Sequence, residues 1–511
     1  MKISCAIHIT FLSIILSSSS TVCGFSTGSS EQRTPKKDFT TKIVEDAVVT
    51  DVSSKVLRRN KKASDINKPK PLNSREKSFT QRDPIISLNM NLDYLAKSGQ
   101  RDAAKRCEEM LTRIEALHAD GYYEKPPDVV SYNSVINSYA HGRTSTSPNS
   151  RSSNAKRLMK RMEGKGIQPN TVTYNTLLRC IMKEINEKPK DKIKEAETIL
   201  RYMEEVNLAN TISYNTIISM HSKSNLDESA ERAEKWLQRM IELYNENPQN
   251  DKIQPDTVSF NSVIHAYSNA PITKGAPERA KKAKELLNQM ESLYKSGKND
   301  NVKPDTISYS AVVNSYAKCQ NSLCAVKALA LLEHMEDLHK SGNKDVKPNK
   351  RTYTSCINAF GRVGNPKAAD DLLTKMKELY NAGDVSLKPD TITYSSVLNA
   401  YARKGGEDSA YRADELLSEM FDLYNSGNYD VKPNTQIFRT VITALGKSKH
   451  SRAAEKAERL LAEMEDLSSE YPDVAPNTIC YNAVIDAWSR SKMPRKVRVC
   501  VVLLCIMLCS I

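Results

Sequence analysis

Residues 391–401 read TITYSSVLNAY and residues 413–420 read ADELLSEM, and related stretches recur in this order along most of the chain. Both stretches place apolar residues at helical spacing, which predicts two amphipathic helices joined by a short turn. Pro389-Asp390 stands directly before the first stretch. A proline stops one helix and an Asp or Asn caps the next, so this dipeptide marks the boundary between two units.

An aromatic residue, usually followed by a small polar residue, marks the first helix of each unit. The spacing between successive aromatics runs from 40 to 49 residues, and a weaker copy of the motif opens the series at Leu88. A period of this length indicates stacked structural repeats. The aromatics are Tyr132, Tyr174, Tyr214, Phe260, Tyr309, Tyr353, Tyr394, Phe438 and Tyr481.

The second helix of each unit carries a methionine with an alanine seven residues before it. Seven residues is about two helical turns, so the two side chains share one face, which we expect to pack in the core. The methionines are Met110, Met162, Met203, Met240, Met290, Met335, Met376, Met420 and Met464.

These patterns predict an all-α fold, a right-handed α-solenoid of about nine helix–turn–helix repeats over residues 85–490. No single unit can bury its apolar face alone, whereas stacked units share a continuous core. The predicted units are 85–128, 129–170, 171–210, 211–256, 257–305, 306–349, 350–390, 391–434 and 435–477, with a half-unit at 478–490.

The two ends of the chain depart from the repeat pattern. Residues 1–25 have the charged start and apolar stretch of a signal-type leader, and residues 26–84 are rich in Ser, Thr and Lys, which predicts a disordered transit or linker region. Together they resemble the two-part targeting sequences of algae with secondary plastids, in which the transit peptide often begins with Phe, here Phe25. We therefore expect an organellar protein, with a plastid favoured over a mitochondrion. The apolar tail at 491–511 is too short to span a bilayer and is either a packed helix or an artefact that replaces the true C-terminus.

The composition narrows the class of protein further. No apolar run reaches the roughly 18 residues that a membrane span requires, and we expect no membrane partner. The eleven cysteines form no Cys-x-x-Cys pair, which argues against a disulfide framework and a zinc site. The net charge of +14 suggests a nucleic-acid partner, but residues 85–490 account for only +3 of it. The case for a nucleic-acid partner therefore rests on the repeats.

The order of the motifs resembles the pentatricopeptide repeat family. Residues 172–178, VTYNTLL, followed by Ala-x2-Leu-Leu-x2-Met and a closing Pro-Asp or Pro-Asn, are similar to its repeat, and the resemblance covers residues 85–490. The array is most similar to the P-type arrays of the family, although family units are close to 35 residues long. The excess follows the methionine and predicts a longer second helix and a glycine-containing loop. HEAT-type and tetratricopeptide solenoids are the competing assignments and would imply peptide partners.

The resemblance implies binding of single-stranded RNA, with one base per repeat. In the family, the small polar residue after the aromatic and the last residue of the unit together recognise the Watson–Crick edge of a base. We call these the base-edge residues. Carried over, Asn89 with Asp128 implies U, Asn133 with Asn170 and Asn175 with Asn210 imply C, Asn215 with Asp256 and Asn261 with Asp305 imply U, Ser310 with Asn349 implies A, Thr354 with Asp390 implies G, and Ser395 with Asn434 implies A. The expected site is near 5′-UCCUUAGA, and Arg439 with Asn477 matches no common pairing.

The resemblance also implies that the apolar residue two positions before the aromatic packs on the face of a base. We call these the base-packing residues. Arg351 and Gln436 replace them in the seventh and ninth units. The base-packing residues are Ile86, Val130, Val172, Ile212, Val258, Ile307 and Ile392.

No catalytic motif accompanies the repeats. The sequence contains no His-Glu-x-x-His, phosphate loop or nucleophile elbow, and His334-Met335-Glu336 lacks the Pro-Cys-x-x-Cys that a deaminase requires. We therefore expect a monomeric RNA-binding protein without catalysis, cofactor or metal, which acts in the processing, stabilisation, editing or translation of a transcript, with recruited RNA-processing proteins as further partners. The alternatives are a protein-binding scaffold, and a nuclease or editing factor whose catalytic C-terminal part is missing from this sequence.

Overall fold

The computed structural model describes residues 84–491, apart from residues 101, 142–149, 187, 225, 248–250, 271–274, 449–450 and 470. These residues belong to the second of the two units into which the chain divides, Arg82–Ile511. The predicted leader, the transit region except Pro84, and the apolar tail except Ser491 lie outside the described residues.

Within the described part of the chain, α-helices alternate between two roles. The first helices of the units are α3 (Pro84–Lys97), α5 (Val129–His141), α7 (Thr171–Lys183), α9 (Thr211–Lys223), α11 (Thr257–Asn269), α13 (Thr306–Lys318), α15 (Lys350–Val363), α17 (Thr391–Lys404), α19 (Thr435–Lys447) and α21 (Thr478–Arg490). The second helices are α4 (Ala103–Ala119), α6 (Arg151–Glu163), α8 (Pro189–Glu205), α10 (Ser229–Glu246), α12 (Ala276–Lys295), α14 (Ser322–Lys340), α16 (Pro366–Asn381), α18 (Glu407–Asn425) and α20 (Ser451–Ser468).

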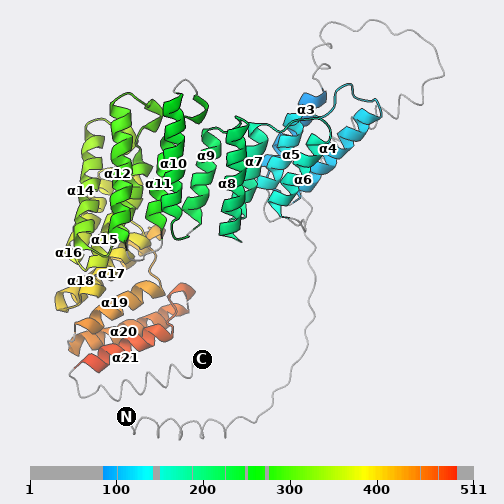
Figure 1. Cartoon of the computed structure of the whole chain (residues 1–511). Helices are drawn as coiled ribbons and strands as arrows, with labels where there is room; N and C mark the ends of the chain where they lie inside the picture. The colour runs from blue at the N-terminus through cyan, green and yellow to red at the C-terminus, as the bar shows by residue number, and fades with distance from the viewer. Residues whose placement is uncertain are drawn as a thin grey trace, which may run out of the picture. The chain divides into compact units, whose positions relative to one another are not determined.

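Each first helix from α5 to α19 packs on the first helix of the next unit, on its own second helix and on the second helix of the preceding unit. Figure 1 shows the pairs following one another in chain order. The first helices therefore form a continuous layer, and the second helices cover one side of it. The prediction of an all-α array of helix–turn–helix repeats is confirmed.

The alanine and methionine column lies in the core. Ala328 and Met335 of α14 are both fully buried, as are the equivalent residues in seven other units. The first unit is the exception, because Met110 is only partly buried and the neighbouring Leu111 takes the fully buried position. The prediction that Met110 is a core residue was therefore wrong, because the next residue, Leu111, occupies the core position in this unit.

In the part of the chain that the structure describes, six short 3-10 helices account for much of the unusual length of the later units. They are η1 (Asp251–Ile253), η2 (Asp300–Val302), η3 (Lys344–Val346), η4 (Val385–Leu387), η5 (Tyr429–Val431) and η6 (Pro472–Val474). In η2 to η6 the last residue of each turn is an apolar side chain that is buried. A glycine with positive φ, such as Gly342 or Gly427, reverses the chain before the turn. The extra residues therefore extend the core.

The same turns make contacts within a unit and between neighbouring units. Within one unit, the hydroxyl of Thr306, the first residue of α13, lies 3.0 Å from the carbonyl oxygen of Asp345 and 2.8 Å from that of Lys347, both in the turn that closes the unit. Ion pairs run beside these bonds, with Lys388 Nζ 2.7 Å from Asp430 and Lys432 Nζ 2.6 Å from Asp473. These exposed pairs each contribute little to stability, but they link each closing turn to the closing turn of the next unit, whereas the hydroxyl bonds hold the closing turn against the first helix of its own unit.

The six cysteines that the structure describes are free and buried, and burial raises the pKa of the Cys107 thiol to about 11. They behave as small apolar residues of the core. In the described residues no helix is long and apolar enough to span a membrane.

Prediction for the methionine column. Met376→Ala leaves a cavity in a fully buried position of α16, so we expect the free energy of unfolding to fall by about 2–5 kcal/mol. Urea unfolding followed by circular dichroism measures this. Leu323→Ala, at a position of α14 that is 59% exposed, is the control and should change stability by less than about 0.5 kcal/mol. Equal losses in the two variants would contradict the assigned core.

Candidate nucleic-acid interface

The last residue of each predicted unit is the N-cap of the next first helix. Asp305 has an extended backbone, and its side chain accepts a hydrogen bond from the backbone N–H of Ser308, the third residue of α13. Asn170, Asn210, Asp256, Asn349 and Asp390 cap their helices in the same way. The cap holds one base-edge residue of each pair at a helix start.

The other member of each pair lies on the first helix of the same unit and extends its side chain toward this cap. In five units the asparagine Nδ2 donates directly to the Oδ1 of the capping side chain. The pairs are Asn89 with Asp128 (3.1 Å), Asn133 with Asn170 (3.3 Å), Asn175 with Asn210 (3.0 Å), Asn215 with Asp256 (3.0 Å) and Asn261 with Asp305 (3.2 Å). The structure therefore brings together the residues that the sequence paired.

The shorter base-edge residues do not reach their caps directly. Ser310 forms a hydrogen bond of 2.7 Å with Thr352, and Thr352 in turn lies against Asn349. Thr354 is 3.2 Å from Thr393, which bonds to Asp390. In these two units the hydroxyl group of Thr352 or Thr393, on the next first helix, connects the two base-edge residues.

The eighth pair is not joined. Ser395 Oγ accepts a weak bond from Asn399 of its own helix (3.5 Å), and Asn434 caps α19 through the N–H of Ile437. The third residue of α19 is Ile437, an apolar side chain, so no hydroxyl stands between Ser395 and Asn434. These two residues lie at the expected positions, but no hydrogen bond of the described structure connects them.

The base-packing residues form an exposed aliphatic row beside the base-edge residues. Their side chains are between 50% exposed, at Val130, and 66% exposed, at Ile392. Other aliphatic residues of the same helices, such as Val135 and Val397, are fully buried. Arg351 and Gln436 take the same exposed position in their units. Ile479, which is 54% exposed, continues the row in the half-unit and was missed in the sequence analysis. Its place two residues before Tyr481 is the signal that identifies it.

The aromatic residues of the motif lie in the core, except Tyr174, which is partly buried, and six of the tyrosines donate their hydroxyl groups to glutamates of second helices. Tyr353 donates to Glu336 (2.6 Å), and Tyr394 donates to Glu419 (2.6 Å). Burial raises the pKa of both phenols well above the usual range. These residues therefore hold the first helices in place and do not face a ligand.

A second row of charged residues occupies the last turns of the first helices, two turns beyond the base-edge residues. Arg403 donates to the carbonyl oxygen of Arg362 (3.3 Å), and Lys447 donates to that of Ala402 (2.7 Å), so each cation covers the end of the preceding first helix. Burial and the neighbouring cations lower the pKa of the Lys318 ammonium. We call Lys318, Arg362, Arg403 and Lys447 the cation row.

The small net charge of residues 85–490 does not reveal the cation row, because acidic residues elsewhere in the array offset these cations in the sum. Each member stands eight residues after the base-edge position of its unit, as Lys318 does after Ser310. That fixed offset is the signal that reveals the row. Lys183, Lys223 and Arg490 occupy the last turns of other first helices.

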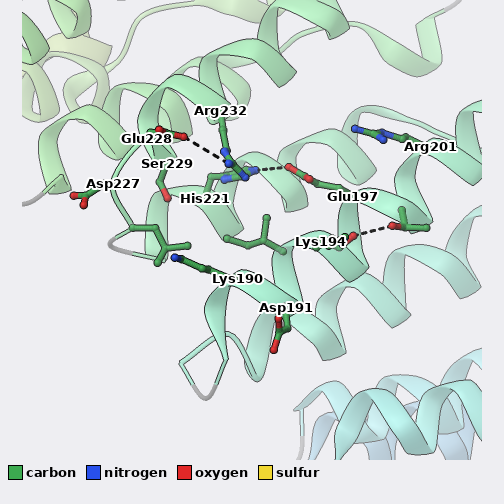
Figure 2. Close-up of a pocket in the computed structure, with 13 residues that line it drawn as sticks. Lys190, Asp191, Lys194, Glu197, Arg201, His221, Asp227, Glu228, Ser229 and Arg232 are labelled. Atoms are coloured by element: carbon green, nitrogen blue, oxygen red, sulfur yellow. Dashed lines mark hydrogen bonds and ion pairs between the residues drawn. The ribbon is translucent and has the colours of Figure 1, made fainter.

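A cavity of about 770 Å³ lies at the other end of α9 from Asn210, between α8 and the start of α10. Figure 2 shows His221 beside Glu197 at the wall of this cavity. His221 Nε2 lies 3.0 Å from Glu197 Oε1, which also accepts from Trp236 Nε1 at 3.1 Å. The hydrogen bond from His221 lowers the pKa of the Glu197 carboxyl. Lys190, Lys194 and the other charged groups around the cavity include both signs. Within the described residues no group of three acidic, His or Cys side chains is placed to bind a metal ion.

Comparison with known proteins identifies the repeats. The model of the PPR repeat family matches residues 127–183, that of the pentatricopeptide repeat domain matches residues 157–224, and that of the pentacotripeptide-repeat region of PRORP matches residues 278–423. The chain is a pentatricopeptide repeat protein, as its sequence resemblance implied.

Two relatives from Arabidopsis thaliana match part of the chain. A mitochondrial pentatricopeptide repeat-containing protein is 27% identical over 168 residues, which is 33% of this chain and 34% of the relative. The small ribosomal subunit protein mL103 (rPPR7) is 28% identical over 160 residues, which is 31% of this chain and 32% of the relative. The chain therefore matches about a third of the length of each.

Among solved structures, the maize pentatricopeptide repeat protein PPR10 matches 84% of this chain and 54% of its own, with 18% identity and a TM-score of 0.42. Its complex with an 18-nucleotide psaJ RNA element matches with 16% identity and a TM-score of 0.30, over 91% of this chain and 63% of that chain.

Prediction for the caps. Asp256 Oδ1 accepts from Ser259 N (2.8 Å), Ser259 Oγ (2.8 Å) and Asn215 Nδ2 (3.0 Å). Asp256→Ala removes the cap of α11, so we expect a loss of about 0.5–2 kcal/mol in the free energy of unfolding. Asp256→Asn should stay close to the unchanged protein, because Asn170 and Asn210 cap equivalent helices. Urea unfolding of both variants measures the difference, and an equal loss in both would show that the cap is not what Asp256 contributes.

Proposed function

We propose that the repeat array binds single-stranded RNA, with one base at each base-edge pair. The observation that carries this proposal is the recurrence, in five units, of a hydrogen-bonded polar pair beside an exposed aliphatic side chain. Such a pair offers donors and acceptors to a base edge, and the aliphatic residue covers the face of the base. The regular recurrence of this exposed aliphatic row supports a role in which each of its side chains packs on the face of one base.

The cation row gives the RNA backbone a place on the same helices. Eight residues of α-helix span about 12 Å, so each cation of the row is displaced by about that distance along its helix from the base-edge position. A strand whose bases meet the polar pairs would then have its phosphates within reach of Lys318, Arg362, Arg403 and Lys447. Phosphate contacts position a nucleic acid, and base contacts specify its sequence.

We propose that the protein acts in organellar RNA metabolism and has no catalysis of its own. The mitochondrial name of one relative supports an organelle, although it does not favour the plastid that the N-terminal sequence suggests. In this proposal the array covers its RNA site or recruits a processing protein, and the processing, stabilisation, editing or translation of a transcript follows from that.

Prediction for RNA binding. The purified chain should bind 5′-UCCUUAGA more tightly than the complementary strand 5′-UCUAAGGA, which differs at four positions, and more tightly still than 5′-AGGAACUC, which differs at all eight. Each lost base contact should cost a few-fold in affinity, because a hydrogen bond is worth about 1 kcal/mol. Gel shifts at a fixed, stated salt concentration measure the three affinities.

The same experiment distinguishes the competing functions. Equal affinity for the three oligonucleotides would contradict the base assignment, and no binding at low salt would contradict an RNA function. Cleavage of the bound oligonucleotide in the presence of Mg²⁺ would contradict the absence of catalysis. Reversal of the charges of Arg362 and Arg403 should weaken binding to all three RNAs alike and lessen its salt dependence.

A further inference from the structure

A buried hydroxyl group lies behind seven of the base-edge pairs. It belongs to the third residue of the next first helix, which is a Ser or Thr and is fully buried in each case. Serine and threonine at this helix position commonly serve only the cap, but these side chains also contact the base-edge residue of the preceding unit in five units. The residues are Ser131, Thr173, Ser213, Ser259, Ser308, Thr352 and Thr393.

The hydrogen bonds of Thr173 can be assigned by counting protons. Its Oγ1 accepts from the backbone N–H of Asn170 (3.1 Å), so the hydroxyl proton remains to be donated. Two acceptors are near, Asn133 Oδ1 at 2.7 Å and Asn170 Oδ1 at 3.1 Å. Asn170 Oδ1 already accepts from Thr173 N and from Asn133 Nδ2. The hydroxyl proton therefore belongs to Asn133 Oδ1.

This bond fixes which way the Asn133 amide faces. Its oxygen accepts from Thr173, and one Nδ2 proton goes to Asn170, so one Nδ2 proton is left for a ligand. A rotated amide would place two donors, Thr173 O–H and Asn133 N–H, against each other. The base therefore meets an N–H donor and not a carbonyl oxygen.

The same arrangement occurs in the two neighbouring pairs. Ser131 Oγ lies 2.6 Å from Asn89 Oδ1, and Ser213 Oγ lies 2.6 Å from Asn175 Oδ1. Each serine Oγ also accepts from the backbone N–H of the residue that caps its helix, which is Asp128 for Ser131 and Asn210 for Ser213. Three successive units thus hold the asparagine amide in one orientation.

The fourth and fifth pairs differ. Ser259 lies 2.8 Å from Asp256 Oδ1 and Ser308 lies 2.9 Å from Asp305 Oδ1, so the carboxylates take these hydroxyl protons. The oxygens of Asn215 and Asn261 are buried with no hydrogen-bond partner. In these units only the bond from Nδ2 to the cap holds the amide.

We propose that Ser131, Thr173 and Ser213 are positioning residues for base recognition, which act by holding the asparagine of the preceding unit with an N–H toward the base. This inference rests on the proposed RNA-binding function. The sequence predicts that two base-edge residues of one unit recognise each base. In this proposal a third residue, from the next unit, also takes part in the recognition.

Thr173→Val tests the role, because valine keeps the shape of threonine and removes the hydroxyl. The affinities of the full chain for 5′-UCCUUAGA and for the oligonucleotides with U, A or G at the second position are measured by fluorescence anisotropy. The unchanged protein should prefer C there, and Thr173→Val should reduce this preference about fivefold, the worth of one hydrogen bond. Preferences at the other positions should remain.

Thr176→Val is the matched control. Thr176 lies one turn along the same helix, is also buried, and bonds to the carbonyl of Val172 in its own helix (2.7 Å). It should keep the preference for C, and Thr173→Ser, which retains a hydroxyl, should keep it too. If Thr173→Val has the same preference as Thr176→Val, the inference is overturned.

A measurement without RNA separates this inference from the proposed function. In a double-mutant cycle of Asn133→Ala and Thr173→Val, followed by urea unfolding, the effects on the unfolding constant should depart from multiplicativity by about fivefold. Multiplicative effects would overturn the hydroxyl–amide bond itself. Coupled effects with no RNA binding would overturn the proposed function and the positioning role with it, while RNA binding without a second-position preference would overturn the positioning role alone.

Discussion

The hydrogen bond that caps each first helix is the interaction on which the rest of the structure depends. At Asn210, for example, the side chain satisfies the N–H of Ser213 and starts α9, the first helix of the next unit, and it also accepts from Asn175 of its own unit. One polar group therefore defines a unit boundary, starts a helix and fixes a side chain that faces outward. Because the capping oxygen is already committed to the fold, its position relative to the base-edge asparagine varies little from unit to unit.

The long units preserve this geometry while adding contacts within each repeat. The 3-10 turns bury an apolar residue such as Val346 or Val431, and the threonine that begins a first helix bonds to the carbonyl oxygens of the following turn. The extra residues therefore lie after the methionine and before the proline, outside the segment from cap to base-edge residue. This explains how units of 40 to 49 residues keep a motif that is typical of shorter ones.

Much of the fold could be predicted from the sequence, because periodic apolar residues and Pro-Asp caps act locally. The helix pairs and the buried alanines and methionines follow from those patterns, whereas the exposed position of residues such as Val172 and Ile307 follows from the family resemblance. Met110 departs because its helix packs through Leu111, a matter of tertiary contact that a fixed spacing does not reveal. The hydroxyl of Thr173 was overlooked for a similar reason, since its partner lies 40 residues away. For Ser395 and Asn434 the sequence pattern predicted a pair that the structure does not join. Both residues fit the motif, but the third residue of the next helix is Ile437, whose side chain cannot form the connecting hydrogen bond.

The central claim is that each polar pair recognises one base, and a change of one pair tests it most directly. Thr354→Asn places an Asn opposite Asp390 and recreates the combination found at Asn215 and Asp256. Selection of RNA ligands from a randomised pool should then show the seventh base changing from G to U while the other positions keep their preferences. An unchanged seventh base, or changes spread over several positions, would contradict the account.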